Sequence, residues 1–204
     1  MSRPSARRNI ENSIRRLGFS RVAGVDEVGR GCLAGPVIAA AVILEPGSRI
    51  SGIRDSKLLT PMARERLYDQ IISCTETWSL GVVGPEEIDR LNIHKASLKA
   101  MHKAVVSLIP PPDFALVDGF SIPDLLIPQR GLFKADRRCT VVAAASILAK
   151  VTRDRQMLKL HELDSRYGFD RNKGYATPEH LDALTRFGHS SNHRRSFRPL
   201  SLSK

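Results

Sequence analysis

Acidic residues interrupt two apolar segments directly before glycines, and this pattern constrains the fold more than any other feature. The first segment is Val25-Asp26-Glu27-Val28-Gly29, and the second is Val117-Asp118-Gly119. A buried carboxylate is costly unless it is paired or binds a metal. Open α/β sheets place their ligand sites outside strand ends. We therefore expect Asp26, Glu27 and Asp118 to meet at one edge of a sheet, with Asp136 as a further acid before a long predicted helix.

A cluster of carboxylates without histidine or cysteine is typical of an Mg²⁺ or Mn²⁺ site. A zinc site is not favoured, because the pair His189 and His193 has no paired cysteines upstream. Taken singly, each acid could instead be an isolated cap or turn residue. The repetition of the pattern at two strand ends favours the metal site.

Asp26 and Glu27 raise a geometric difficulty, because neighbouring residues of a regular strand point to opposite faces. The strand could end at Gly29, or a local twist could turn one side chain. The longer Glu27 side chain could also reach the cleft, or its backbone carbonyl could bind the metal. The sequence leaves these alternatives open.

Apolar periodicity and turn signals predict an α/β domain with a mixed sheet. Strands are expected at 21–28, 37–44, 77–83 and 114–118, with an edge strand at 131–133. Helices are expected around Ile10 to Leu17, from 61, from 85 to 108, from 139 to 166 and from 178 to 187. The small residues Ala143-Ala144-Ala145-Ser146 predict that the long helix lies close against the sheet. We expect a tail or short helix at 1–20, the main domain at 21–168 and a helical, basic extension at 169–204.

The charge balance indicates a polyanionic partner. The 204 residues include 32 Lys and Arg against 21 Asp and Glu, which gives a net charge of +11. Nucleic acid is the favoured partner, and an anionic membrane surface is the alternative. The basic pair Arg194-Arg195 is expected to contribute to that contact.

Other features predict a cytoplasmic protein. The longest apolar run, 32–44, is too short to span a membrane, which takes about 20 residues. The first residues lack the apolar segment of a secretory signal. The three cysteines form no C-x-x-C pair, which is typical of reduced thiols. No apolar stripe in the sequence indicates a dimer interface, so a monomer is expected.

The glycines at 29, 31 and 35 do not form a nucleotide-binding fingerprint. Their spacing is one residue too long for the dinucleotide motif, and a strand-like run follows instead of a helix. What remains is a tight turn whose backbone N–H groups can approach a phosphate or a sugar. A plain turn is the alternative.

Several segments together resemble the type 2 ribonuclease H family, bacterial ribonuclease HII. They cover most of the chain from about residue 22 to 198, in the order of the family. The matching segments are 24–31, 33–36, 55–57, 88–89, 92–93, 117–119, 134–136, 143–151, 172–175 with Thr177 and His180, and 193–197.

This resemblance implies a ribonuclease H-like fold, a mixed five-stranded sheet flanked by helices with a small C-terminal helical extension. It implies hydrolysis of the RNA strand of RNA–DNA hybrids, as in primer removal. It also implies incision on the 5′ side of single ribonucleotides embedded in duplex DNA, leaving a 3′-hydroxyl and a 5′-phosphate. Two Mg²⁺ or Mn²⁺ ions are the implied cofactors.

The resemblance also implies roles for individual residues. Asp26, Glu27, Asp118 and Asp136 are the implied catalytic and metal-binding acids. The turn Gly29, Arg30 and Gly31 is implied to sense the ribose 2′-hydroxyl, and Tyr175 to pack against the sugar. Lys57, Asn92 and Lys173 are implied contacts to the nucleic-acid backbone.

Two other function classes remain at this point. A non-catalytic nucleic-acid-binding protein has no reason to keep carboxylates near phosphate, so the acid set argues against it. A different metal-dependent nuclease, such as an exonuclease or a DNA-strand transferase, could carry acids at similar strand ends. The glycine turn and Tyr175 discriminate against that class, because they imply ribose selection.

Overall fold

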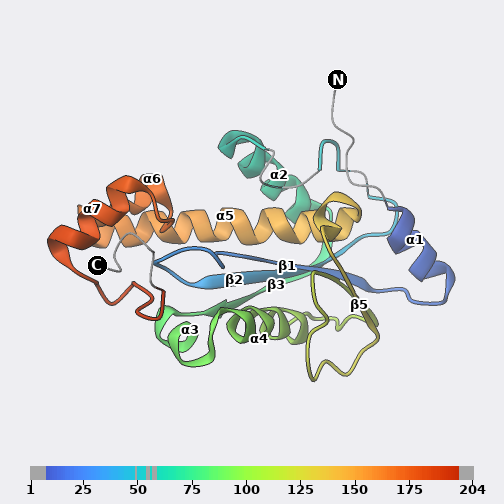
Figure 1. The fold of residues 1–204 in the computed structure, drawn as a ribbon. Coiled ribbons are helices and arrows are strands. Elements are labelled where there is room, and N and C mark those ends of the chain that lie inside the picture. The colour runs from blue at the N-terminus through green and yellow to red at the C-terminus, as the bar shows by residue number, and fades with distance from the viewer. Residues whose placement is uncertain (1–7, 49, 54–55, 57–58, 198–204) are drawn as a thin grey trace.

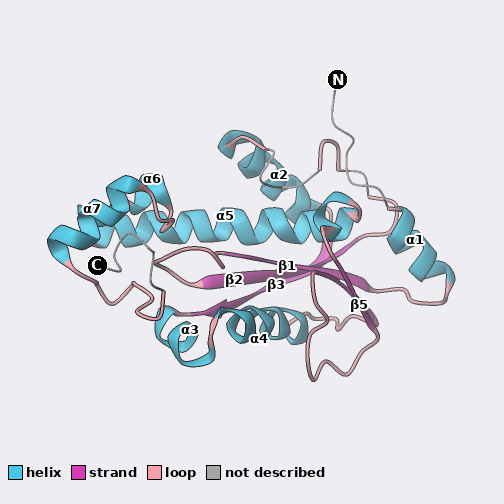
Figure 2. Cartoon of the chain, viewed as in Figure 1, coloured by secondary structure: helices cyan, strands magenta, loops and turns pink. Residues whose placement is uncertain are grey.

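The computed structural model describes residues 8–48, 50–53, 56 and 59–197. Figure 1 shows a central sheet with helices above and below it, and Figure 2 shows the same arrangement by type of element. The strands are β1 (Val22–Val28), β2 (Val37–Leu44), β3 (Thr75–Val83), β4 (Phe114–Asp118) and β5 (Gln129–Leu132). The helices are α1 (Asn9–Arg16), α2 (Pro61–Ser73), α3 (Pro85–Leu91), α4 (Ile93–Val106), α5 (Thr140–Leu163), α6 (Phe169–Asn172) and α7 (Pro178–Phe187).

The five strands form one mixed sheet in the order β3-β2-β1-β4-β5. The first three strands pair antiparallel, whereas β1, β4 and β5 run parallel. This confirms the predicted mixed five-stranded sheet. Because β1 and β4 are parallel neighbours, their carboxyl ends lie at the same edge of the sheet.

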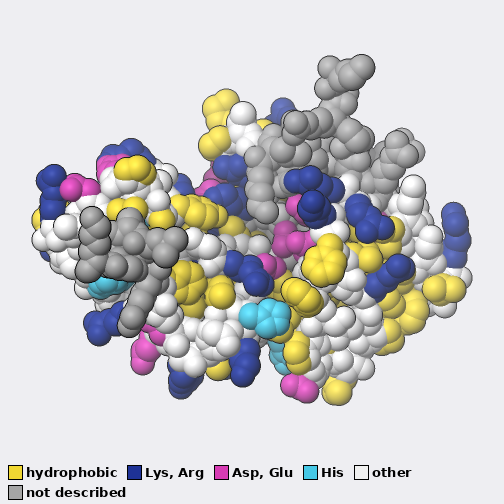
Figure 3. Space-filling model, in the orientation of Figure 1, with side chains coloured by type: hydrophobic (Ala, Val, Ile, Leu, Met, Phe, Trp, Pro, Cys, Tyr) yellow, Lys and Arg dark blue, Asp and Glu magenta, His cyan; other side chains and the backbone are white. Residues whose placement is uncertain are grey.

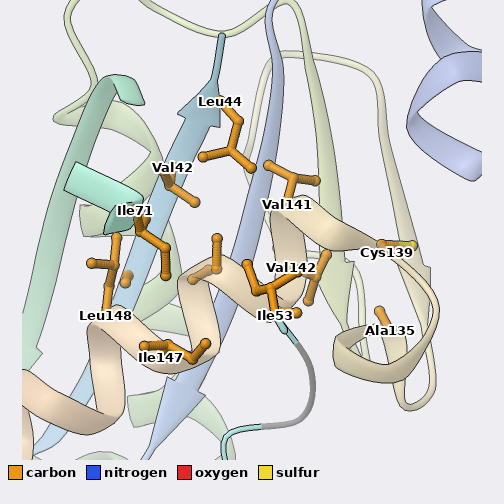
Figure 4. Packing of buried hydrophobic residues seen from close by; sticks show 14 of the residues in the cluster. Val42, Leu44, Ile53, Ile71, Ala135, Cys139, Val141, Val142, Ile147 and Leu148 are labelled. Atoms are coloured by element: carbon orange, nitrogen blue, oxygen red, sulfur yellow. The ribbon is translucent and has the colours of Figure 1, made fainter. Parts of the chain in front are cut away.

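Two apolar cores cover the two faces of the sheet. On one face, α5 and α2, which contributes Ile71, pack on side chains of β2 such as Val42 and Leu44, as Figure 4 shows. On the other face, α4 packs on side chains such as Val25 and Val117. A third cluster joins Met157 of α5 to Tyr167, Phe169 and Leu184 of the C-terminal segment.

The long helix α5 lies very close to the sheet, as its small residues predict. Val141 to Ala149 are all buried. A Cβ atom added to Gly24 of β1 would stand 2.3 Å from the backbone of Val141. Only glycine therefore permits this approach, which brings the start of α5 against the first half of β1.

The structure differs from the prediction at several element boundaries. The helix expected from 85 to 108 is two helices, because Asn92 adopts a φ of 71° and caps α4 by accepting a hydrogen bond from Lys95 N. The edge strand begins at Gln129 instead of 131, β3 begins two residues early at Thr75, and α5 ends at Leu163. The helix predicted from 61 is confirmed, with Thr60 as its N-cap.

The division into three regions at 20 and 168 stays a prediction. Among the helices that the structure describes, none combines the length and the apolar character needed to cross a membrane.

Candidate active site

Asp26 and Asp118 stand side by side on two parallel strands. The pairing of β1 with β4 places Val25 opposite Val117, so the next residue on each strand is one of the two acids. Asp26 is 6% exposed. Its burial, and then the charges of Glu27, Asp118 and Asp136, raise its pKa well above the usual value. Negative charge is therefore concentrated at this edge of the sheet.

Asp136 reaches the same place from a separate segment. It lies in a 3₁₀ turn, Ala135–Arg137, after Lys134 has turned the chain with a φ of 56°. The backbone N–H of Ala135 donates to Oδ1 of Asp118 at 2.7 Å, which ties this turn to the end of β4. Asp136 is as buried as Asp26, at 6%.

Glu27 remains on the regular ladder of β1, which continues to Val28 and ends directly before Gly29. Its carboxylate lies 3.6 Å from the guanidinium of Arg30. Its charge still contributes to the raised pKa of Asp26. The structure therefore brings all four acids into electrostatic contact, from β1, β4 and the turn before α5.

The donor chemistry of these residues fits a hard divalent cation. Within the described part of the chain, no three His, Cys, Asp or Glu side chains are arranged as a ready metal site. All four candidate ligands are carboxylates, which Mg²⁺ and Mn²⁺ prefer. Burial, and then repulsion by the other carboxylates, raises the pKa of Asp26, and a bound cation would relieve that repulsion. The residues therefore fit the metal that the sequence predicts.

Two buried arginines donate hydrogen bonds to the loop that carries the glycine turn beside the acids. Arg153 of α5 is fully buried and donates to the carbonyls of Ala34 and Pro36, each at 3.0 Å. Arg194 is 1% exposed and donates to the carbonyls of Arg30, at 3.0 Å, and Gly35, at 2.8 and 3.0 Å. The loop carrying the glycines is thus fixed in position by long-range hydrogen bonds.

Gly31 lies on the open side of this turn, where an added Cβ would meet no atom within 4 Å. Gly29 lies on the closed side, with a φ of 94°, and an added Cβ would stand 2.4 Å from Nε of Arg153. One glycine of the motif is therefore required by the fold, whereas the other leaves room for a ligand.

Tyr175 lies next to the same loop and is 41% exposed. The carbonyl of the preceding Gly174 accepts hydrogen bonds from Leu33 and Ala34 of the loop. The amine of Lys150 stands 6.0 Å from the centre of the Tyr175 ring. The structure thus brings the aromatic residue and the glycine turn together, as the sequence predicts.

The remaining predicted contacts are less closely joined to the acids. Asn92 is exposed, and its side chain caps α4. The amine of Lys173 donates to the carbonyl of Asp170 at 2.7 Å, and burial, followed by the charge of Lys150, lowers its pKa. Lys57 lies outside the described residues.

The structure corrects one expectation and adds residues that the sequence analysis missed. Arg194 does not face solvent, so the expected nucleic-acid contact of the Arg194-Arg195 pair does not hold for it, because its guanidinium is used inside the protein. Arg153 was not singled out. Its spacing of four from the buried Ala149 and Met157 is a signal that it lies on the buried face of α5.

Ser146 is a second residue that was not assigned to the site. Its hydroxyl hydrogen-bonds Asp26, which opposes the rise in the pKa of that carboxyl. It also lies 3.0 Å from the hydroxyl of Ser56, in a buried contact. Figure 3 shows acidic side chains gathered near the middle of one face, bordered by Lys, Arg and hydrophobic side chains.

Comparisons with known proteins agree with this geometry. The profile of the family described as ribonuclease HII matches residues 23–200. The chain is 51% identical over 193 residues to the ribonuclease HII of Geobacillus thermodenitrificans, covering 93% of this chain and 73% of that one. It is 52% identical over 180 residues to the ribonuclease HII of Nitrosococcus oceani, covering 88% and 90%.

The fold also matches solved structures of related proteins. The ribonuclease H2 of Pyrococcus horikoshii superimposes with a TM-score of 0.72 at 28% identity, covering 87% of this chain and 94% of that one. The chain solved in the PCNA:RNase HII complex from Archaeoglobus fulgidus gives a TM-score of 0.75 at 27% identity, covering 88% and 96%.

Proposed function

The chain belongs to the ribonuclease HII family, and we propose that it cuts duplex DNA on the 5′ side of a single embedded ribonucleotide. The family supports ribonuclease H activity on RNA–DNA hybrids. The observation that carries the finer proposal is the adjacency of Asp26 and Asp118 to the turn of Gly29, Arg30 and Gly31. Cutting leaves a 3′-hydroxyl and a 5′-phosphate, and its role is to remove embedded ribonucleotides and RNA primers.

Asp26, Glu27, Asp118 and Asp136 hold the divalent cations in this proposal. Two bound Mg²⁺ or Mn²⁺ ions would supply an activated water and neutralise the leaving 3′-oxygen. The four carboxylates come from three segments, so they can bind from several directions. Ser146 and the N–H of Ala135 fix the orientation of Asp26 and Asp118.

The glycine turn selects ribose. At a fixed sugar, the 2′-hydroxyl is the group that distinguishes RNA from DNA. The open space over Gly31 allows the backbone to approach that hydroxyl. Tyr175, exposed beside the loop, packs against the neighbouring sugar.

The rest of the chain binds the duplex without reading its sequence. Lys57, Asn92 and Lys173 contact the phosphate backbone in this proposal, and contacts of this kind position a duplex without specifying bases. The net charge of +11 attracts the polyanion, so affinity falls steeply with salt. The protein acts in the cytoplasm as a monomer.

A cleavage assay on matched duplexes tests the proposal. The substrates are a DNA duplex with one ribonucleotide, an RNA–DNA hybrid and an all-DNA control. We expect cuts in the first two, with a 5′-phosphate at the ribonucleotide, and no cuts in the control. Activity should disappear in EDTA and in Asp118→Asn. Equal cutting of the all-DNA control, or unchanged activity in EDTA, would contradict it.

A further inference from the structure

Three rings form an exposed aromatic rim next to the acids: His94, Phe120 and Phe133. The ring centres of His94 and Phe120 are 5.3 Å apart, and those of Phe120 and Phe133 are 5.4 Å apart, both in edge-to-face geometry. Phe120 is 53% exposed and Phe133 is 69% exposed. Large apolar rings that contact one another while facing water mark an interaction surface.

The rim is joined directly to the segments that carry the acids. Phe120 follows Asp118 by two residues, and Phe133 precedes Asp136 by three. His94 lies in the first turn of α4, two residues after Asn92. In Figure 3, hydrophobic and histidine side chains lie beside the acidic side chains in the middle of the visible face.

The loop that holds Phe120 is anchored. The side-chain amide of Gln129 accepts from Ile122 N and donates to Ile122 O, each at 2.7 Å. An added Cβ on Gly131 would stand 2.6 Å from the carbonyl of Gly119, so the two ends of the loop are in close contact. The rim is therefore presented by a closed loop, which lowers the entropy cost of binding.

Tyr175 and the rim flank the acids from opposite faces of the sheet. The rim contacts α4, which covers one face, whereas Tyr175 lies beside Lys150 of α5, which covers the other. A duplex that touches Tyr175 and places a phosphate over the acids therefore continues toward the rim.

We propose that the rim of His94, Phe120 and Phe133 packs against the sugars of the bound duplex in its minor groove. This inference rests on the proposed function. An RNA-like helix displays its 2′-hydroxyls in a wide, shallow minor groove. A site that reads a 2′-hydroxyl approaches from that groove, so the rings beside the acids meet the apolar edges of neighbouring sugars.

The charge around the rim favours nucleic acid over a second copy of the chain or an apolar protein. The surrounding segments carry Lys95, Arg130, Lys134, Arg137 and Arg138, against Asp124 and the site acids. All five basic residues are exposed. Apolar rings bordered by cations suit a ligand with apolar sugars and charged phosphates.

The test compares Phe120→Ala, Phe133→Ala and the double variant with Leu126→Ala. Leu126 is fully exposed and lies in the same loop between β4 and β5 as Phe120, so it is a matched control for loss of a surface apolar side chain. The Kd for a DNA duplex with one ribonucleotide is measured by fluorescence anisotropy in EDTA, over a range of salt. KM and kcat are measured in Mn²⁺, and thermal unfolding confirms that each variant folds.

We expect each Phe variant to raise Kd and KM about tenfold, with kcat within about twofold of the wild type. The double variant should raise Kd and KM further. The increase should be smaller than the product of the two single-variant effects, because the two rings touch. The slope of log Kd against log salt should not change, because no cation is removed.

A Kd within twofold of the wild type in both Phe variants would overturn the proposal, as would an equal loss in Leu126→Ala. A change in sedimentation with unchanged Kd would assign the rim to a second copy instead, which also overturns it. Failure of the wild type to cut the duplex would contradict the proposed function alone, because the binding measurement does not depend on cutting.

Discussion

His180 and His193 are joined by a buried hydrogen bond, with their Nε2 atoms 3.0 Å apart. Their neighbours fix which nitrogens carry protons. Nδ1 of His180 lies 2.8 Å from the carbonyl oxygen of Tyr175, so it is a donor. Nδ1 of His193 faces the backbone N–H of Ser190 at 3.0 Å, so it is an acceptor. In two neutral rings, Nε2–H of His193 therefore donates to Nε2 of His180.

This pair links the two segments that support the glycine loop. His180 holds the carbonyl of Tyr175, whereas His193 directly precedes Arg194. A proton added to His180 would enter Nε2 and place two N–H groups opposite each other across the link, whereas a proton added to His193 would enter Nδ1 and face the backbone N–H of Ser190. Each added proton therefore removes one hydrogen bond of this buried pair, and the neutral rings keep them all.

The first prediction is that the protein loses stability as the pH falls from about 6.5 to about 4. Burial, and then the charges of His180 and His189, lower the pKa of His193 to about 4, whereas Asp164 opposes the shift. The unfolded chain binds this proton near pH 6.5, so stability from the neutral form is complete above that pH and is lost below it. The loss is about 3 kcal/mol.

Urea unfolding of the wild type and of His193→Gln between about pH 4 and pH 7.5 measures this contribution. The variant should show a flatter dependence of unfolding free energy on pH, although other acids titrate in both proteins. Parallel curves would mean that His193 does not titrate as its burial requires.

The sheet and the acid site could be predicted from the sequence because their signals are local. Acidic residues that interrupt an apolar run shortly before a glycine identify both β1 and β4 at their site ends. Asn92 shows where a local signal was missed. It interrupts no apolar stripe, yet it is a good N-cap residue, and its positive φ divides one predicted helix into two.

The supports of the glycine loop could not be predicted because they join distant residues. Arg194 contacts Arg30 across 164 positions, and Arg153 contacts Pro36 across 117. A basic tail and a helical arginine look like solvated side chains until the fold buries them. The buried hydrogen bond between His180 and His193 likewise depends on packing that no periodicity encodes.

We predict that Asp26→Asn stabilises the protein while abolishing cleavage. The raised pKa of Asp26 means that its charge is unfavourable in the folded protein without a cation. Asn keeps an oxygen that can accept from the N–H of Glu27, as Asp26 does at 2.7 Å. Removing the charge should add about 0.5–2 kcal/mol to the unfolding free energy in EDTA.

Thermal unfolding in EDTA and in Mn²⁺ compares the effect of the Asp26 charge on stability without and with a divalent cation. The wild type should gain stability on addition of Mn²⁺, and the variant should gain less. Reduced stability of Asp26→Asn in EDTA would show that the carboxylate is paired favourably and that the site does not need a cation.

Arg194→Lys is predicted to lower kcat by tenfold or more with little change in duplex affinity. A lysine amine cannot reproduce the planar fork that binds the carbonyls of Arg30 and Gly35 together. Buried acceptors left unpaired should also cost about 1–3 kcal/mol of stability. Arg195→Lys, at an exposed neighbouring position, is the matched control and should leave kcat and stability unchanged. A loss confined to duplex affinity would indicate a phosphate contact instead of a positioning role.

The two glycines of the turn should separate folding from substrate recognition. Gly29→Ala puts a methyl group 2.4 Å from Nε of Arg153 and 2.8 Å from the carbonyl of Pro36, at a φ that disfavours alanine. We expect it to destabilise the protein by about 1–3 kcal/mol.

Gly31→Ala meets no atom within 4 Å and needs no positive φ, so its stability should change by less than about 0.5 kcal/mol. Its cleavage at an embedded ribonucleotide should nevertheless fall at least about tenfold, because the methyl group occupies space where the backbone approaches the ribose. Urea unfolding and cleavage rates of both variants check this contrast, and wild-type cleavage by a stable Gly31→Ala would show that the turn does not touch the sugar.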